Sequence, residues 1–143
     1  MFYLLFLVWA ASANGQNYMN IELLSSWRDT TKPIVPDAFS YNEVYGYSQN
    51  GREYGIIGMD SSTRIIDITD PLHPIEVANI PGTKMAIHRD YHTYGNYLYA
   101  VSEEDPSGGG IYDLQYLPDS VVSVTDSIYG YSYAHNIFID TVA

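Results

Sequence analysis

Cysteine is missing from this sequence, and basic residues are scarce. The 143 residues include no Cys, 6 Lys and Arg together, and 17 Asp and Glu, which gives a net charge of −11. The lack of Cys excludes a disulfide framework, a thiolate metal site and a cysteine nucleophile. The surplus of acid excludes recognition of nucleic acid through a basic surface.

Well-known catalytic signatures are missing as well. The sequence contains no Gly-x-Ser-x-Gly elbow and no His-Glu-x-x-His zinc motif. The three glycines at 108–110 are not followed by a Lys-Ser/Thr pair, so they are not a phosphate-binding loop. No motif of a hydrolase or of a nucleotide-binding enzyme is therefore present.

Helical periodicity is absent, and the composition favours strands. Apolar residues make up 46% of the chain, which also has 15 Tyr and many Ile and Val. The apolar positions alternate or run together, and they rarely recur at the i+3 and i+4 spacing of a helix. The content is too apolar for a disordered acidic chain. We therefore expect an all-β fold.

The N-terminal segment is an apolar run over residues 2–13. It is shorter than the roughly 20 residues that cross a bilayer, and small residues follow it. We expect residues 1–15 to be a signal peptide, cleaved after Ala13 or Gly15, and the protein to be secreted or held at the cell surface. The segment before the run carries no Lys or Arg, so a buried first strand is the alternative.

Two turn signals divide the remaining sequence into repeats. Asn50-Gly51 and Gly95-Asn96 each separate two strand-like segments, so each predicts a hairpin. After each hairpin come a strand with a central aspartate (Asp67 or Asp113), a proline turn and a fourth strand. The two aspartates lie 46 residues apart, and other equivalent positions lie 43 to 46 residues apart.

A four-stranded unit of this length predicts a β-propeller blade. The expected segments are a piece with the outer strand of a preceding blade (16–40), two whole blades (41–82 and 83–130) and the first strand of a further blade (131–143). The outer strand would cover residues 21–27, and the last strand residues 134–140. Because a propeller closes with about 4–8 blades, we expect the chain to be an N-terminal part of a larger protein that holds the remaining blades.

The order of these motifs resembles the choice-of-anchor B family of LVIVD-repeat proteins. The similar segments read IIDITDPLHPIEVANIPG, HRDYHTYGNYLYAV, IYDLQYLPDSV and AHNIFID, within residues 41–140. The resemblance covers about 100 of the 143 residues. It implies a propeller-like fold, export and a C-terminal anchoring segment outside this sequence. It implies no established catalytic activity.

Histidines and an aspartate form the sharpest local signal. On a strand, His88, Asp90 and His92 share one face, and His135 lies 47 residues beyond His88 in the next repeat. Imidazoles with a carboxylate suit Zn²⁺ or another divalent cation, and an open position would activate water. The alternative is hydrogen bonding to backbone groups. The resemblance favours Asp90 and His135, because the family has Trp at the position of His88.

Other polar and aromatic groups leave two interpretations each. The acidic loop at 103–110 offers oxygen ligands for Ca²⁺, but it lacks the spacing of an EF-hand and also suits a solvated loop. Asp67 and Asp113 recur at one repeat position, which favours carboxylates that cap backbone groups over an acid–base pair. The tyrosines of the hairpins either form a contact surface, as for sugars, or fill the space between blades.

The sequence as a whole predicts an exported β-propeller that serves as a binding or display scaffold, with an extracellular protein, a glycan or the cell envelope as partner. A metal-dependent enzyme with His88, Asp90, His92 and His135 as ligands is the alternative, and a purely structural matrix protein is a third possibility. Convergence of the three histidines on one point separates the enzyme from the other two.

Overall fold

The computed structural model describes residues 21–32, 40–82, 85–104, 109–125 and 133–141. These residues contain eight strands and no helix, hence no helix that could span a membrane. The predicted signal peptide at 1–15 lies outside them. The first sheet comprises β1 (Tyr41–Gln49), β2 (Arg52–Met59), β3 (Ser62–Asp67) and β4 (Ile75–Pro81), and the second comprises β5 (Arg89–Tyr94), β6 (Tyr97–Ser102), β7 (Gly109–Asp113) and β8 (Val122–Thr125).

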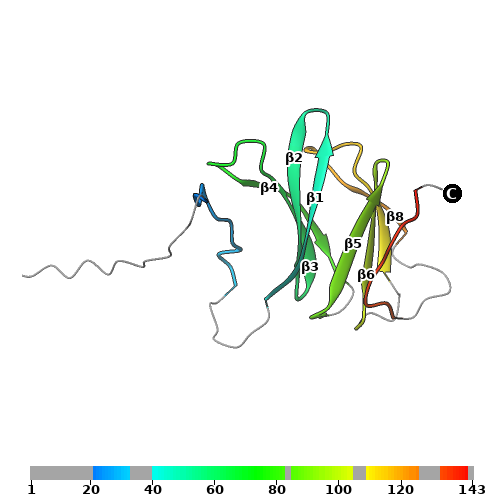
Figure 1. The fold of residues 1–143 in the computed structure, drawn as a ribbon. Coiled ribbons are helices and arrows are strands. Elements are labelled where there is room, and N and C mark those ends of the chain that lie inside the picture. The colour runs from blue at the N-terminus through cyan, green and yellow to red at the C-terminus, as the bar shows by residue number, and fades with distance from the viewer. Residues whose placement is uncertain (1–20, 33–39, 83–84, 105–108, 126–132, 142–143) are drawn as a thin grey trace, which may run out of the picture.

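Each sheet is an antiparallel meander in which consecutive strands are neighbours (Figure 1). This confirms the all-β fold built from four-stranded antiparallel units, while the blade bounds of 41–82 and 83–130 stay predictions. The first hairpin turns at Asn50 and Gly51, which both have positive φ (52° and 75°), as a two-residue turn between twisted strands requires. Gly95 has a φ of 58° in the second hairpin, where Tyr94 pairs with Tyr97.

The strands predicted outside the two sheets are not formed. Residues 21–27 and 134–140 have no strand pairing. A strand exists only where a second strand supplies hydrogen-bond partners, and neither segment has such a partner among the described residues. The 21–27 segment is held by a bond from the Ser25 hydroxyl to the Pro71 carbonyl. Residues 21–27 and 134–140 therefore form no strand in this structure, and the outer strand of a preceding blade and the inner strand of a following blade stay predictions.

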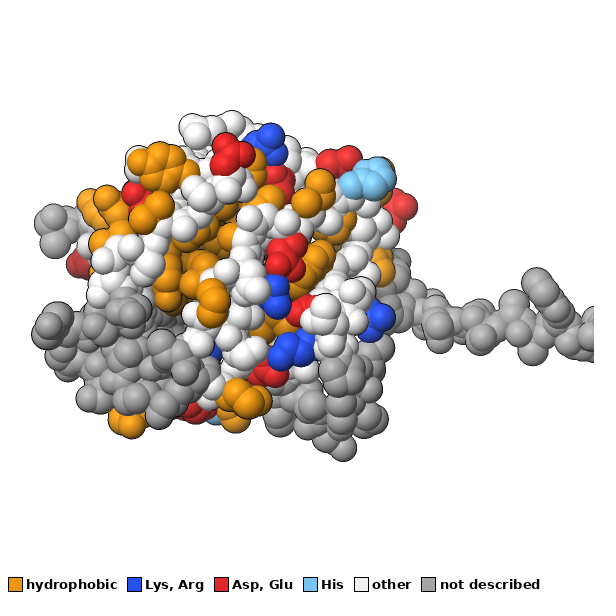
Figure 2. Space-filling view, turned by 180° about the vertical axis from the view of Figure 1, so that it is seen from behind, with side chains coloured by type: hydrophobic (Ala, Val, Ile, Leu, Met, Phe, Trp, Pro, Cys, Tyr) orange, Lys and Arg blue, Asp and Glu red, His pale blue; other side chains and the backbone are white. Residues whose placement is uncertain are grey.

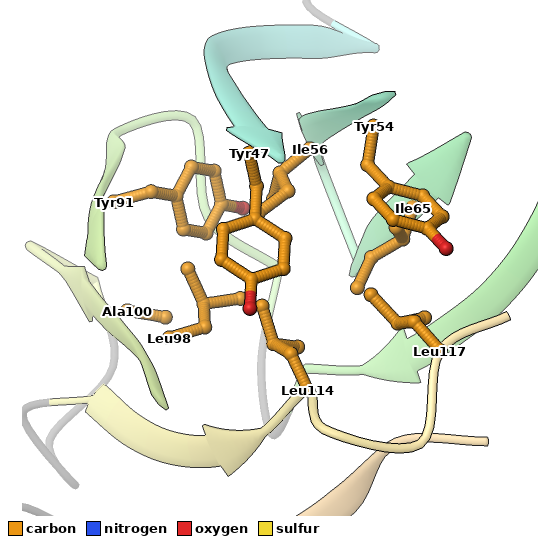
Figure 3. Close-up of a cluster of buried hydrophobic side chains, with 9 residues drawn as sticks. All are labelled: Tyr47, Tyr54, Ile56, Ile65, Tyr91, Leu98, Ala100, Leu114 and Leu117. Atoms are coloured by element: carbon orange, nitrogen blue, oxygen red, sulfur yellow. The ribbon is translucent and has the colours of Figure 1, made fainter. Parts of the chain in front are cut away.

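The two sheets pack face to face around a shared apolar core (Figure 3). Side chains from the inner face of each sheet meet there, and three of the tyrosines lie among them. This confirms, for those three, that hairpin tyrosines fill the space between the sheets. The core residues are Tyr47, Tyr54, Ile56, Ile65, Tyr91, Leu98, Ala100, Leu114 and Leu117.

Polar bonds cross the same interface. The buried hydroxyls of Thr63 and Tyr91 lie 2.7 Å apart, and burial raises the pKa of Tyr91 to about 12. Arg89 Nε donates to the Met59 carbonyl at 3.0 Å, and Gln49 Nε2 donates to the Leu114 carbonyl at 3.1 Å. A buried hydroxyl needs such a partner, because an unpaired one costs about 1–3 kcal/mol.

Asp67 and Asp113 have the structural role expected from their repetition. The Oδ1 atoms of Asp67 and Asp113 accept the backbone N–H two residues ahead, from Thr69 and Gln115, both at 2.9 Å. They end β3 and β7 and do not lie at mid-strand. Burial alone would raise the pKa of Asp67, but hydrogen bonds from Thr69 and Arg52 outweigh burial and hold this pKa below its ordinary value.

The pair between the sheets can be tested by a double-mutant cycle. Tyr91→Phe leaves the Thr63 hydroxyl buried without its partner, so we expect the free energy of unfolding to fall by about 1–2 kcal/mol in urea denaturation. Adding Thr63→Val removes both polar groups, and the double variant should recover part of this loss. Strictly additive effects of the two substitutions would contradict the proposed bond.

The second prediction concerns acid stability. Asp67→Ala loses a backbone cap and the 2.6 Å ion pair with Arg52, so we expect a loss of about 1–2 kcal/mol at pH 6. Because the pKa of Asp67 is lower in the folded state, its contribution is present above the unfolded pKa and is lost as pH falls through the folded pKa. Urea midpoints of the wild type and the variant should therefore converge toward pH 3.

Asp113→Ala is the matched control. Asp113 caps Gln115 and has no ion pair among the described residues. Its substitution should destabilise the protein less than Asp67→Ala at pH 6. An Asp67→Ala effect that stays constant from pH 6 to pH 3 would argue against the ionised pair.

Candidate functional site

Histidines and glutamates meet at the end of the second sheet that lies opposite its hairpin turn. His88 directly precedes β5, and Glu103 directly follows β6. Because β5 and β6 are antiparallel, with Arg89 opposite Ser102, the residues just beyond that pair lie side by side. The Glu103 N–H donates to the His88 carbonyl at 3.4 Å, which extends the ladder by one step.

Four side chains form this site, and we call them the His/Glu cluster: His88, Glu103, Glu104 and His135. His88 Nδ1 donates to Glu104 Oε1 at 2.7 Å and lies 3.3 Å from Glu103 Oε2. His135 Nδ1 lies 2.9 Å from the other oxygen of Glu103. The centroids of the two imidazole rings are 5.4 Å apart. Glu103 thus joins the two histidines.

The cluster is partly exposed and rich in negative charge. The exposed fractions of its side chains run from 31% for Glu104 to 58% for His135. Burial alone would raise the pKa of Glu104, but hydrogen bonds from the ring and the backbone N–H of His88 outweigh burial and hold this pKa below its ordinary value. Glu104 is therefore an ionised carboxylate at neutral pH.

The donor atoms are close enough to serve one ion. One ligand atom each from His88, Glu103 and Glu104 lies within 4.8 Å of the other two. Imidazole nitrogen and carboxylate oxygen are ligands for Zn²⁺ and similar divalent metals. The ligand types predicted for a metal lie together at His88, but the carboxylates beside it are Glu103 and Glu104 and not Asp90.

Asp90 does not belong to the cluster. Its Oδ1 accepts the N–H of Tyr91 and its Oδ2 accepts the N–H of Ile137, both at 2.8 Å. Asp90 therefore holds backbone groups, which was the alternative to metal binding. The structure thus places His88 in the cluster and Asp90 outside it, whereas the family resemblance favours Asp90 over His88.

His92 also lies apart from the cluster. Its Nδ1 donates to the Thr93 carbonyl at 3.1 Å, and its ring packs against Tyr45 and Phe138 at 5.6 and 6.0 Å. A strand rises about 3.3 Å per residue, so positions four apart on one face are about 13 Å apart. The three histidines therefore do not converge, and only His88 and His135 come together.

Glu103 and Glu104 belong to the acidic loop at 103–110, for which the sequence predicts either Ca²⁺ ligands or a solvated loop. Residues 105–108 of this loop lie outside the described residues. The sequence signal that places Glu103 near His88 is the β5–β6 hairpin. The register counted outward from the turn at Gly95-Asn96 places His88 opposite Glu103.

Both hairpin turns lie at the opposite end (Figure 1), and several exposed apolar side chains belong to the turns and connections there. The backbone bond from Ile68 to Glu53 places the β3–β4 connection at this end, and the bond from Leu114 to Asn96 does the same for the β7–β8 connection. We call these residues the hairpin-end surface: Ile68, Leu72, Tyr94, Tyr97 and Tyr116, each at least 41% exposed. Tyr94, Tyr97 and Tyr116 are exposed, unlike the three tyrosines in the core.

A shallow apolar groove separates the outer strands of the two sheets. Figure 2 shows apolar side chains gathered across the middle of the rear face. The groove measures about 350 Å³, and its lining includes Val77, Ala78, Ile80, Pro81, Tyr112 and Val121. Among the described residues that line it, the polar side chains are those of Asn79, Tyr112 and Ser123.

No protein-family model, curated protein or solved structure matches this chain. The resemblance to the choice-of-anchor B family therefore stays a prediction that rests on the repeat motifs alone.

A substitution at Asp90 tests its role as a backbone acceptor. Asp90→Ala removes the acceptor of the Ile137 N–H, so we expect hydrogen exchange of that amide to accelerate at least about tenfold, as the loss of a charge-assisted bond predicts. His92→Ala, which keeps this bond, is the control. Unchanged exchange at Ile137 in Asp90→Ala would contradict the assignment.

Proposed function

We propose that this chain is part of an exported or cell-surface β-propeller that acts as a binding or display scaffold. The observation that carries the proposal is the hairpin-end surface, to which both sheets contribute exposed apolar side chains at the same end. Backbone bonds tie the β3–β4 and β7–β8 connections, which carry part of this surface, to residues of the neighbouring hairpins.

Tyrosine is suited to such a contact. Its ring offers a large apolar area with few rotamers to freeze, and its hydroxyl hydrogen-bonds at the rim. Tyr94 and Tyr97 are cross-strand partners, and Tyr116 follows on the neighbouring connection at the same end. The chain's net charge of −11 disfavours polyanions. A protein or a glycan of the cell envelope is the partner class that we propose.

Export and membership of a larger propeller belong to the same proposal. The apolar segment at 2–13 supports export, and the two equivalent four-stranded sheets support a repeat architecture. The resemblance to LVIVD-repeat proteins supports both. The competing proposal, a metal-dependent enzyme with a His/Asp site, has less support because Asp90 and His92 lie apart from the other two predicted ligands.

Binding to cell envelopes tests the scaffold. The double variant Tyr94→Ser/Tyr116→Ser removes two exposed rings from the hairpin-end surface. We expect the apparent dissociation constant of the labelled protein on envelopes of its source organism to rise at least tenfold, since exposed tyrosines are frequent binding hot spots.

The matched control is Tyr133→Ser, which removes a ring that is 61% exposed beside the His/Glu cluster. Its binding should equal that of the wild type. Protease treatment or glycosidase treatment of the envelopes then distinguishes a protein partner from a glycan. Equal binding of the double variant and the wild type would refute the role of this surface.

A further inference from the structure

We propose that the His/Glu cluster is a binding site for one divalent transition-metal ion, with Zn²⁺ as the reference ion. The site lies at the end of the second sheet away from the hairpin-end surface. A six-residue strand such as β5 is about 20 Å long, so the two surfaces are independent. The inference thus goes beyond the scaffold function and stands without it.

The distances in the cluster suit a metal ion. In a tetrahedral zinc site with bonds of about 2.0–2.1 Å, the ligand atoms lie about 3.3 Å from one another. His88 Nδ1 and Glu103 Oε2 already lie 3.3 Å apart. The bonds from His88 to Glu104 and from His135 to Glu103, at 2.7 and 2.9 Å, are shorter because a proton lies between the atoms. An ion held by His88, Glu103 and Glu104 takes the place of these protons, and the His135 ring completes the set by moving toward them from its contact with Glu103.

The donor set selects the class of ion. Two neutral imidazoles and two carboxylates supply four ligands and the two negative charges that balance a divalent cation. Ca²⁺ takes six to eight oxygen ligands and Mg²⁺ prefers oxygen, so a set that is half nitrogen favours Zn²⁺ and its transition-metal neighbours. All four side chains are at least 31% exposed, so an ion reaches them from solvent.

The equivalent corner of the first sheet supports the assignment. Asp60 follows β2 as Glu103 follows β6, and its N–H donates to Ser40 as that of Glu103 donates to His88. At this corner the carboxylate of Asp60 is bound by Lys32 Nζ, at 2.7 and 3.0 Å. A lysine ammonium occupies the place of a cation there. In the second sheet, two imidazoles lie beside the equivalent carboxylate, and imidazole nitrogen is a ligand for divalent metals.

The ligands come from three separate segments, which gives the ion a structural effect. His88 precedes β5, the glutamates follow β6, and His135 belongs to the 133–141 segment. The Ala134 N–H donates to the Ser102 carbonyl at 3.2 Å and thereby places His135 beside Glu103. A bound ion therefore crosslinks the 133–141 segment to the second sheet.

Isothermal titration of the metal-free protein with Zn²⁺ tests the site. We expect one ion per chain, and at least tenfold weaker binding in each of His88→Ala and His135→Ala. Zn²⁺ should also slow hydrogen exchange in residues 133–141 and raise the melting temperature of the wild type, because a ligand that binds only the folded state stabilises it. Co²⁺ in place of Zn²⁺ should give the visible absorption of a four-coordinate site.

Two control variants test whether Zn²⁺ binding depends on the His/Glu cluster and not on any histidine of the chain. His73→Ala removes a histidine whose Nδ1 lies 2.9 Å from Asp70 in an isolated, exposed pair. His92→Ala removes the histidine that shares the face of β5 without joining the cluster. Both should bind Zn²⁺ within twofold of the wild type. Glu103→Gln keeps the size of the side chain and should weaken binding, even if an alanine variant fails to fold.

Absence of saturable Zn²⁺ binding by the wild type would overturn the site. An equal loss of affinity in His73→Ala or His92→Ala would do the same, because binding would then not depend on the cluster. Neither result touches the scaffold proposal, whose envelope assay depends on Tyr94 and Tyr116. Envelope binding that persists in the presence of a chelator is expected if the two sites act independently.

Discussion

The face-to-face packing of the two sheets is the constraint on which the rest of this structure depends. A sheet with one apolar face must cover that face, and here each sheet covers the other. Tyr91 is central to the contact, because its ring is buried and its hydroxyl bonds to Thr63 across the interface. Arg89, on the same face of β5, reaches the Met59 carbonyl. Together these side chains fix which face of β5 points inward.

The choice of the inward face of β5 also fixes which side chains lie on its outward face. Because side chains alternate along a strand, burial of Tyr91 turns Asp90 and His92 toward the 133–141 segment. Asp90 then accepts the Ile137 N–H, and His92 packs against Phe138. His88, just before the strand, lies at the corner where the ladder ends and meets Glu103 there. The strand register that buries Tyr91 thus also determines that His88 joins the His/Glu cluster.

Local chemistry made most of the fold predictable. Asn50-Gly51 and Gly95-Asn96 specify tight turns, and the alternating segments around them specify strands and register. The site was predictable only in part. His88, Asp90 and His92 lie on one face of the strand, but they are spread along it, so their side chains do not converge. Glu103 comes from the partner strand and is found only by counting the register. Residues 21–27 and 134–140 have strand-like sequences but form no strand. A strand needs a partner strand, and the sequence of one segment does not show whether such a partner is present.

The two repeats carry the same backbone corner with different chemistry. At the first sheet, Lys32 pairs with Asp60 and Asp29 pairs with Arg64, so fixed charges clip the 29–32 segment to the sheet. At the second sheet, the clip on the 133–141 segment consists of Asp90 and of imidazoles bound to Glu103. Lysine and arginine supply fixed positive charges, whereas imidazole nitrogen is a ligand for metal ions. The two sheets thus present equivalent backbone positions, at which a carboxylate meets an ammonium in one sheet and imidazoles in the other.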